Sequence, residues 1–149
     1  MSTIARWRAR GATLEAMIAL LVARTLVARV PLRRWRARLG RPVTPPPESA
    51  GRPLDANLAA RRLARAVERG AARLPGDSLC LPRAMALHWL LARRGLGGVL
   101  HLGVRAGSRR GGLDDLHAWV TREGEVLIGA SDEPHRAVFA ASLSIHQDW

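Results

Sequence analysis

The sequence predicts an α+β fold in which a run of helices precedes a small antiparallel sheet. Helical periodicity dominates the first two thirds of the 149 residues, and alternating apolar and polar residues follow it. Helices first and strands afterwards is an order typical of α+β proteins. A chain of this length can bury a core without disulfides or metals, and its one cysteine excludes an internal disulfide and a multi-cysteine zinc site.

Residues 1–40 predict a basic, apolar helical arm. Residues 13–29 are rich in good helix formers, and Pro31 suits the first turn of a second, short helix that Gly40 closes. The uncharged centre of the first helix is far shorter than the roughly 20 residues of a membrane span. We therefore expect a helix that is buried in the protein or lies at an interface.

Residues 41–54 are rich in proline and predict a linker. A core domain over residues 55–149 follows it. Its first helix is expected from Asp55 to about Leu74, with one apolar face at helical spacing. That face consists of Ala59, Leu63, Ala66, Val67, Ala71 and Leu74.

A second helix of the core domain is expected over residues 81–94 and ends at Gly95. Residues 98–106 then alternate as a strand does. Residues 116–131 predict two strands around a turn at Glu123–Gly124. We expect the residues after this hairpin to form an irregular tail.

The net charge is +12, and all 24 basic residues are arginine. A chain this basic can bind nucleic acid, a membrane surface or an acidic partner. The arginines are spread over nearly every segment and no nucleic-acid-binding fingerprint is present, so we interpret them as a compositional bias. Trp7 and Trp35, each flanked by arginines, leave a membrane contact open.

The single cysteine suits a reducing compartment, and no convincing cleavage site for a signal peptide follows the apolar stretch. We therefore expect a cytoplasmic protein. Peripheral contact of residues 1–40 with a membrane or a transporter stays open.

Cys80 lies in the segment GDSLCLPRAMALHWLLARRG, residues 76–95, where a helix is predicted to begin. A lone cysteine is more often a small buried hydrophobe. The unpaired N–H groups and the dipole of a helix N-terminus, however, favour negative charge, and they can hold the oxyanion of a tetrahedral intermediate. A nucleophilic cysteine in this place would also need a base.

Five histidines are candidates for that base. His88 lies two turns into the same helix and cannot reach back. His101 lies in the first strand, and His135 and His146 lie in the expected tail. His117 opens the second strand beside a tryptophan that could hold its ring in one orientation, although a structural edge histidine fits this pattern as well.

The segments CLPRAMALHWLLARRGL, HLGVRAG and HAWVTREGEVLIG together resemble the leader peptidases of lasso-peptide biosynthesis, which belong to the transglutaminase-like cysteine protease superfamily. The resemblance extends over about residues 55–130, and an arginine-rich arm before the core is also typical of those enzymes. It implies a transglutaminase-like (papain-like) core of helices packed on a small antiparallel sheet.

The resemblance implies that Cys80 attacks the peptide bond between the leader and the core of a ribosomally made precursor peptide. His117 would take the thiol proton and then protonate the departing amine. The freed core would pass to a separate ATP-dependent macrolactam cyclase. Because the chain has no room for a leader-recognition domain, a separate leader-recognition protein is implied. No cofactor, metal or nucleic acid is expected.

The third member of the catalytic triad departs from the family pattern. The family usually places an aspartate about a dozen residues beyond the histidine, and Gly129 occupies that position. Asp132 is the nearest candidate. A two-residue turn at Glu123–Gly124 would place Ala130 opposite His117, with Asp132 as a diagonal neighbour on the same face. A backbone carbonyl or a water molecule could orient the imidazole instead.

Two other functions fit the sequence. One is a catalytically inactive transglutaminase-like scaffold that holds precursor and cyclase together, which the glycine at the acid position favours. The other is a basic nucleic-acid-binding protein, which only the net charge favours.

Overall fold

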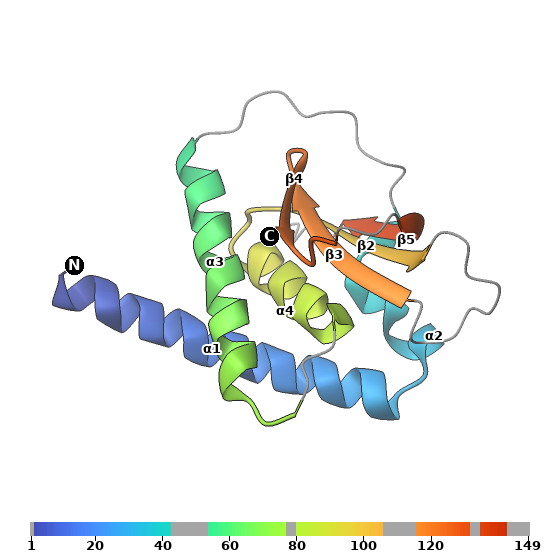
Figure 1. The fold of residues 1–149 in the computed structure, drawn as a ribbon, viewed down its shortest axis with the longest axis horizontal. Coiled ribbons are helices and arrows are strands. Elements are labelled where there is room, and N and C mark those ends of the chain that lie inside the picture. Colours follow the sequence, from blue (N-terminus) through green and yellow to red (C-terminus); the bar gives the residue numbers. More distant parts are fainter. Residues whose placement is uncertain (1, 43–53, 77–79, 106–115, 132–134, 143–149) are drawn as a thin grey trace, which may run out of the picture.

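The computed structural model describes residues 2–42, 54–76, 80–105, 116–131 and 135–142. Within these residues, four α-helices and a five-stranded sheet form three layers (Figure 1): α1 crosses α3 and α4 on one side, and α4 separates α1 from the sheet. The helices are α1 (Thr3–Arg29), α2 (Leu32–Trp35), α3 (Leu54–Arg73) and α4 (Cys80–Arg93). The predicted α+β class is confirmed.

Helix α1 is longer than predicted. It is one continuous helix from Thr3, because the Ser2 side chain accepts a hydrogen bond from the N–H of Ala5 and caps the first turn. The helix ends at Arg29, since the following Val30 precedes a proline and is extended.

The short second helix is confirmed as one turn of α2 followed by the 3-10 turn η1 (Arg36–Leu39), which Gly40 ends with φ of 107°. Trp35 is buried there and its Nε1 donates to the carbonyl of Val30. The first two residues of the predicted linker, Arg41 and Pro42, form the edge strand β1 instead. Proline is tolerated at a sheet edge. Residues 43–53 lie outside the described residues.

Helices α3 and α4 confirm the predicted core helices within one or two residues at each end. The predicted apolar face of α3 packs into the core, where Leu63, Ala66 and Val67 are buried. Helix α4 is buried along most of its length, which fits its position between α1 and the sheet. Arg93 and Arg94, near its end, pair with Glu15 of α1. The hydrogen bond from Arg94 lowers the pKa of that carboxyl group.

The sheet has the strand order β1-β5-β2-β3-β4, and neighbouring strands are antiparallel. Three of these strands were predicted: β2 (Val99–Arg105), β3 (Leu116–Arg122) and β4 (Glu125–Ile128). The turn at Glu123–Gly124 is confirmed, with both residues at positive φ, 51° and 78°.

The expected irregular tail is wrong in part, because His135–Ser142 forms strand β5 in the interior of the sheet. Strand β5 pairs with β2 on one side and with β1 on the other. Alanine occupies three of its eight positions and has a low strand propensity, so the local pattern was weak. The pairing partners on both sides supply the stability that its composition lacks.

His88 is a buried histidine of α4 with a structural role. Its side chain is 1% exposed, and its Nε2 donates to the carbonyl of Leu39 at 2.7 Å, which ties α4 to η1. Its Nδ1 is buried without a hydrogen-bond partner among the described residues. Burial lowers the pKa of His88 below its ordinary value, and the hydrogen bond to Leu39 opposes this only in part.

This burial predicts a loss of stability at mildly acidic pH. An unfolded histidine binds a proton near pH 6.5, whereas folded His88 binds it only at lower pH. The unfolded state therefore holds more protons below about pH 6.5, and the free energy of unfolding falls as pH falls, by at most about 1.4 kcal/mol per pH unit for one group. His88→Gln keeps a donor for Leu39 and should remove this dependence.

Urea unfolding of wild type and His88→Gln at pH 5.0 and pH 7.5 measures the effect. Burial also lowers the pKa of His101, but that contribution is common to both proteins and cancels in their difference. A wild-type protein that loses no more stability on acidification than the variant contradicts the prediction.

Candidate active site

Cys80 is the first residue of α4, and its side chain is partly exposed. Its Sγ lies 3.8 Å from the carbonyl oxygen of Leu116, to which the thiol can donate a weak hydrogen bond. Leu116 is the first residue of β3 and is bonded to His117. The start of α4 thus meets the start of β3, and the thiol lies beside the peptide group that joins Leu116 to His117.

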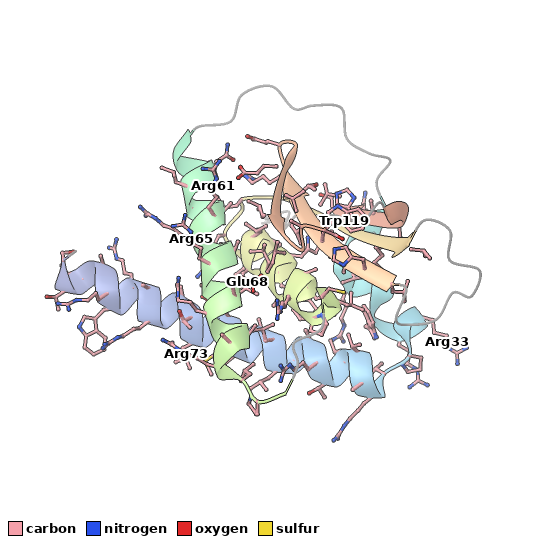
Figure 2. The ribbon with its side chains drawn as sticks, viewed as in Figure 1. Arg33, Arg61, Arg65, Glu68, Arg73 and Trp119 are labelled. Atoms are coloured by element: carbon pink, nitrogen blue, oxygen red, sulfur yellow. The ribbon has the colours of Figure 1, made fainter. Side chains whose placement is uncertain are left out.

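The imidazole of His117 is held by a backbone carbonyl. Its Nε2 lies 2.5 Å from the oxygen of Gly129. Because a carbonyl only accepts hydrogen bonds, Nε2 carries a proton, and in the neutral ring the lone pair is on Nδ1. The ring also stacks on Trp119, with centroids 5.7 Å apart and planes 20° apart. Trp119 projects from β3 and is labelled in Figure 2.

Gly129 can hold His117 in this way because of its backbone. Its φ is 80°, in the left-handed region that favours glycine. A Cβ at this position would lie 2.5 Å from the carbonyl oxygen of Ala118 and 2.9 Å from Cβ of Trp119. The residue at the expected acid position is therefore packed against the backbone of β3 too closely for any side chain.

A β-bulge between β3 and β4 shifts the register ahead of Gly129. Thr121 pairs with Val126 as the turn predicts, but the register shifts by one residue before the next pair, which joins Val120 to Ile128. The expectation that His117 faces Ala130 is therefore wrong. Apart from the glycine itself, no local pattern in the sequence indicates this bulge.

A second candidate histidine, His101, lies on this face of the sheet, and its position beside Trp119 was not predicted from the sequence. His101 of β2 pairs with Trp119 of β3 and stacks on its ring, with centroids 5.1 Å apart and planes 6° apart. Its Nε2 lies 2.7 Å from Oγ1 of Thr121. Trp119 therefore lies between the rings of His101 and His117, and the cross-strand register, which sequence alone does not give, places it there.

Of the other candidates, the structure describes the side chain of His88 but not those of His135, His146 and Asp132. His88 is buried against η1, as described above, and His135 begins β5. Asp132 and His146 lie outside the described residues. No group of three or more histidine, cysteine, aspartate or glutamate side chains in the described ranges could hold a metal ion.

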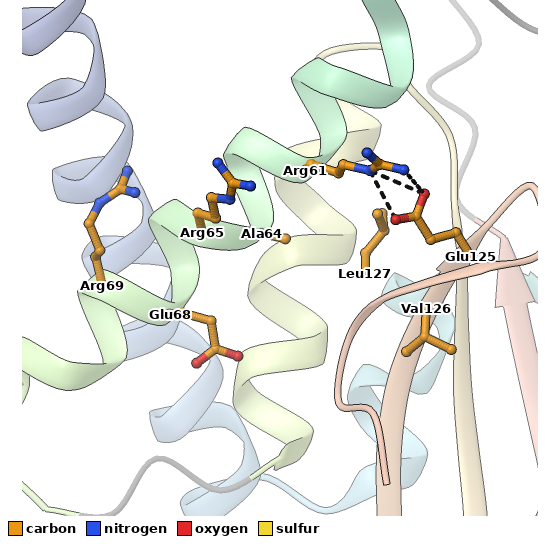
Figure 3. A pocket seen from close by; sticks show the side chains of 8 residues that line it. All are labelled: Arg61, Ala64, Arg65, Glu68, Arg69, Glu125, Val126 and Leu127. Carbon is orange, nitrogen blue, oxygen red and sulfur yellow. Dashed lines mark hydrogen bonds and ion pairs between the residues drawn. The ribbon is translucent and has the colours of Figure 1, made fainter. Parts of the chain in front are cut away.

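A cavity of about 410 Å³ lies away from Cys80, between α3 and β4. Figure 3 shows Arg61 of α3 paired with Glu125 of β4 at its rim. The hydrogen bonds that Arg61 donates to the Glu125 carboxylate raise the pKa of Arg61. Neither Cys80 nor His117 lines this cavity, so it is separate from the candidate active site.

Comparison with protein families identifies the fold family. The model of the transglutaminase-like superfamily matches residues 17–142, which include Cys80, His117 and about the second half of α1. The chain belongs to the transglutaminase-like superfamily. The match confirms the superfamily that the sequence motifs indicated. This superfamily includes cysteine proteases. No curated protein and no solved structure matches the chain.

Proposed function

We propose that this transglutaminase-like protein is a cysteine peptidase that removes the leader from a lasso-peptide precursor. The observation that supports this most is that the start of α4 meets the start of β3. The thiol of Cys80 begins α4 beside the Leu116–His117 peptide, while the carbonyl of Gly129 fixes the proton of His117 on Nε2. A cysteine at a helix start and a histidine of fixed tautomer are the two parts that thiol peptidases need.

In the proposed reaction, Nδ1 of His117 accepts the thiol proton and Sγ of Cys80 attacks the carbonyl carbon of the scissile bond. The N–H groups of the first turn of α4 stabilise the oxyanion. The C–N bond then breaks, and the imidazolium gives its proton to the departing amine of the core peptide. Water hydrolyses the remaining thioester, which frees the leader as a carboxylic acid and restores the thiol.

Asp132 stays a proposed third member of the triad. The carbonyl of Gly129 already orients His117, so a carboxylate would add electrostatic support to the imidazolium rather than set the ring orientation. Asp132→Asn should then lower the rate of cleavage less than replacement of His117 does. An unchanged rate would leave the carbonyl as the orienting group without carboxylate support.

The proposed partners follow from the same reaction. The substrate is a precursor peptide, a separate leader-recognition protein presents it, and an ATP-dependent macrolactam cyclase uses the amine that cleavage frees. The site itself needs no cofactor, because the nucleophile, the base and the oxyanion donors are protein groups.

Cleavage of the neighbouring precursor, in the presence of the leader-recognition protein, tests the proposal. Mass spectrometry should show one cut between leader and core, and prior alkylation of the single cysteine with iodoacetamide should abolish it. Release that continues after complete alkylation contradicts a role for Cys80 as the nucleophile.

A catalytically inactive scaffold is the second candidate, because Gly129 replaces the expected acid. The two functions differ in the reactivity of the thiol. An active peptidase should react with iodoacetamide more slowly when His117 is replaced by alanine, since the base is lost. In a scaffold, the rate of alkylation should not depend on His117.

A further inference from the structure

The outer face of α1 is an unusual surface for a small protein. Of the nine large hydrophobic residues that are most exposed in the described chain, six belong to this helix, with exposed fractions from 49% to 67%. They are Ile4, Trp7, Leu14, Ile18, Leu21 and Val22. Successive members of this set are three or four residues apart, with Gly11 between Trp7 and Leu14 and with Val22 beside Leu21. This spacing aligns them in a stripe along one side of a helix.

The opposite side of α1 is fixed in the protein core. Ala16, Leu20 and Ala23 are fully buried and pack in the same cluster as α3 and α4. Glu15 adds ion pairs to Arg93, the last residue of α4, and to Arg94, which follows it. Helix α1 therefore cannot turn its apolar stripe inward without breaking the core, and the stripe is a genuine outward surface.

The charges beside the stripe have one sign. Arg6, Arg8 and Arg10 are exposed on the first turns of α1, and the guanidinium of Arg10 lies 5.9 Å from the ring centre of Trp7. Arg29 ends the helix, and Arg33 is exposed at the far end of the arm (Figure 2). The helix has one acidic residue, Glu15, which α4 already neutralises.

We infer that α1 lies flat on an anionic lipid bilayer, with the stripe Ile4–Val22 among the acyl chains and its arginines at the phosphate groups. Apolar side chains on one face beside cationic ones are the pattern of helices that bind at the bilayer interface. Arginine and tryptophan at the helix start suit the headgroup region. The net charge of +12 attracts the whole protein to a negative surface.

The fold favours an α1 that lies flat on the bilayer over an α1 that spans it. By length and composition alone, α1, with 27 residues, could cross a membrane. Crossing would pull Ala16, Leu20 and Ala23 out of the core, and Glu15 away from its two arginines, into hydrocarbon. Lying flat keeps every one of these contacts and buries only the side that is already exposed.

Charge also argues against a second copy of the chain as the occupant. Two copies that packed stripe to stripe would bring the cluster of Arg6, Arg8 and Arg10 near other arginines, without free acidic groups on α1 to compensate. Anionic lipid headgroups provide that compensation.

Flotation of the full chain with vesicles tests the inference. The protein should float with vesicles of phosphatidylcholine and phosphatidylglycerol at 7:3, and at least tenfold less with pure phosphatidylcholine or in 1 M NaCl. Ile18→Glu should reduce flotation at least tenfold. Val126→Gln removes another exposed apolar side chain, from β4 outside the stripe, and should leave flotation unchanged.

Circular dichroism and thermal unfolding should be the same for both variants, since both positions are exposed. Absence of flotation with anionic vesicles, or equal loss in both variants, overturns the inference. So does resistance of the bound protein to extraction by alkaline carbonate, which would indicate spanning. Light scattering tests the alternative of a dimer. If the wild type is a dimer and Ile18→Glu is a monomer, the stripe binds a second copy of the chain instead. These readouts do not depend on peptidase activity.

Discussion

Cys80→Ala is expected to lower the rate of leader release by about 10³-fold or more, because the nucleophile cannot be replaced by any other thiol in the chain. His117→Ala should have a similar effect, since without the base the thiol attacks slowly and the departing amine lacks a proton donor. The two losses should not add in the double variant, because the two side chains act as one unit.

The measurement is the initial rate of leader release, followed by mass spectrometry at saturating leader-recognition protein. His101→Ala is the matched control. It removes the other imidazole that stacks on Trp119 but leaves the bond from His117 to Gly129 in place, so we expect less than a tenfold change. A loss in His101→Ala as large as in His117→Ala would show that the assay reports the integrity of the sheet rather than the chemistry.

Gly129→Ala is expected to damage both stability and activity. The new Cβ would overlap the carbonyl oxygen of Ala118, at 2.5 Å, in a backbone conformation with φ of 80°. Strain of this kind costs about 3 kcal/mol or more unless the bulge rearranges. Rearrangement would move the carbonyl that holds Nε2 of His117, so the rate of cleavage should fall at least tenfold.

Gly129→Asp sharpens this prediction. It restores the residue type that the family usually has at this position, yet it should be no more active than Gly129→Ala, because the bulge leaves no room for the side chain. Gly124→Ala is the control: its φ of 78° is equally positive, but a Cβ there meets nothing within 4 Å. It should therefore cost only about 1 kcal/mol. Thermal unfolding and cleavage rates measure both effects, and a Gly129→Asp variant more active than wild type would be the contrary result.

The sequence predicted the elements whose signals are local. The apolar face of α3, the prolines and glycines that bound the helices of the arm, and the turn at Glu123–Gly124 depend on near neighbours in the chain, and each is confirmed. The candidates Cys80 and His117 came from the same local signals and from motif resemblance. Their positions at the start of a helix and of a strand follow from those signals.

What the sequence could not predict depends on partners distant in the chain. Strand β5 owes its stability to pairing with β1 and β2 rather than to its own alanine-rich composition.

Sequence alone determined the class of fold, the predicted core helices and the two residues that could carry thiol chemistry, because helical and strand periodicity and end signals act over a few residues. Tertiary structure decided the register, the bulge that places the carbonyl of Gly129 against the imidazole of His117, and the side of α1 that stays outside the core. These features result from packing between segments far apart in sequence, where backbone geometry and steric contact, rather than local preference, determine which groups meet.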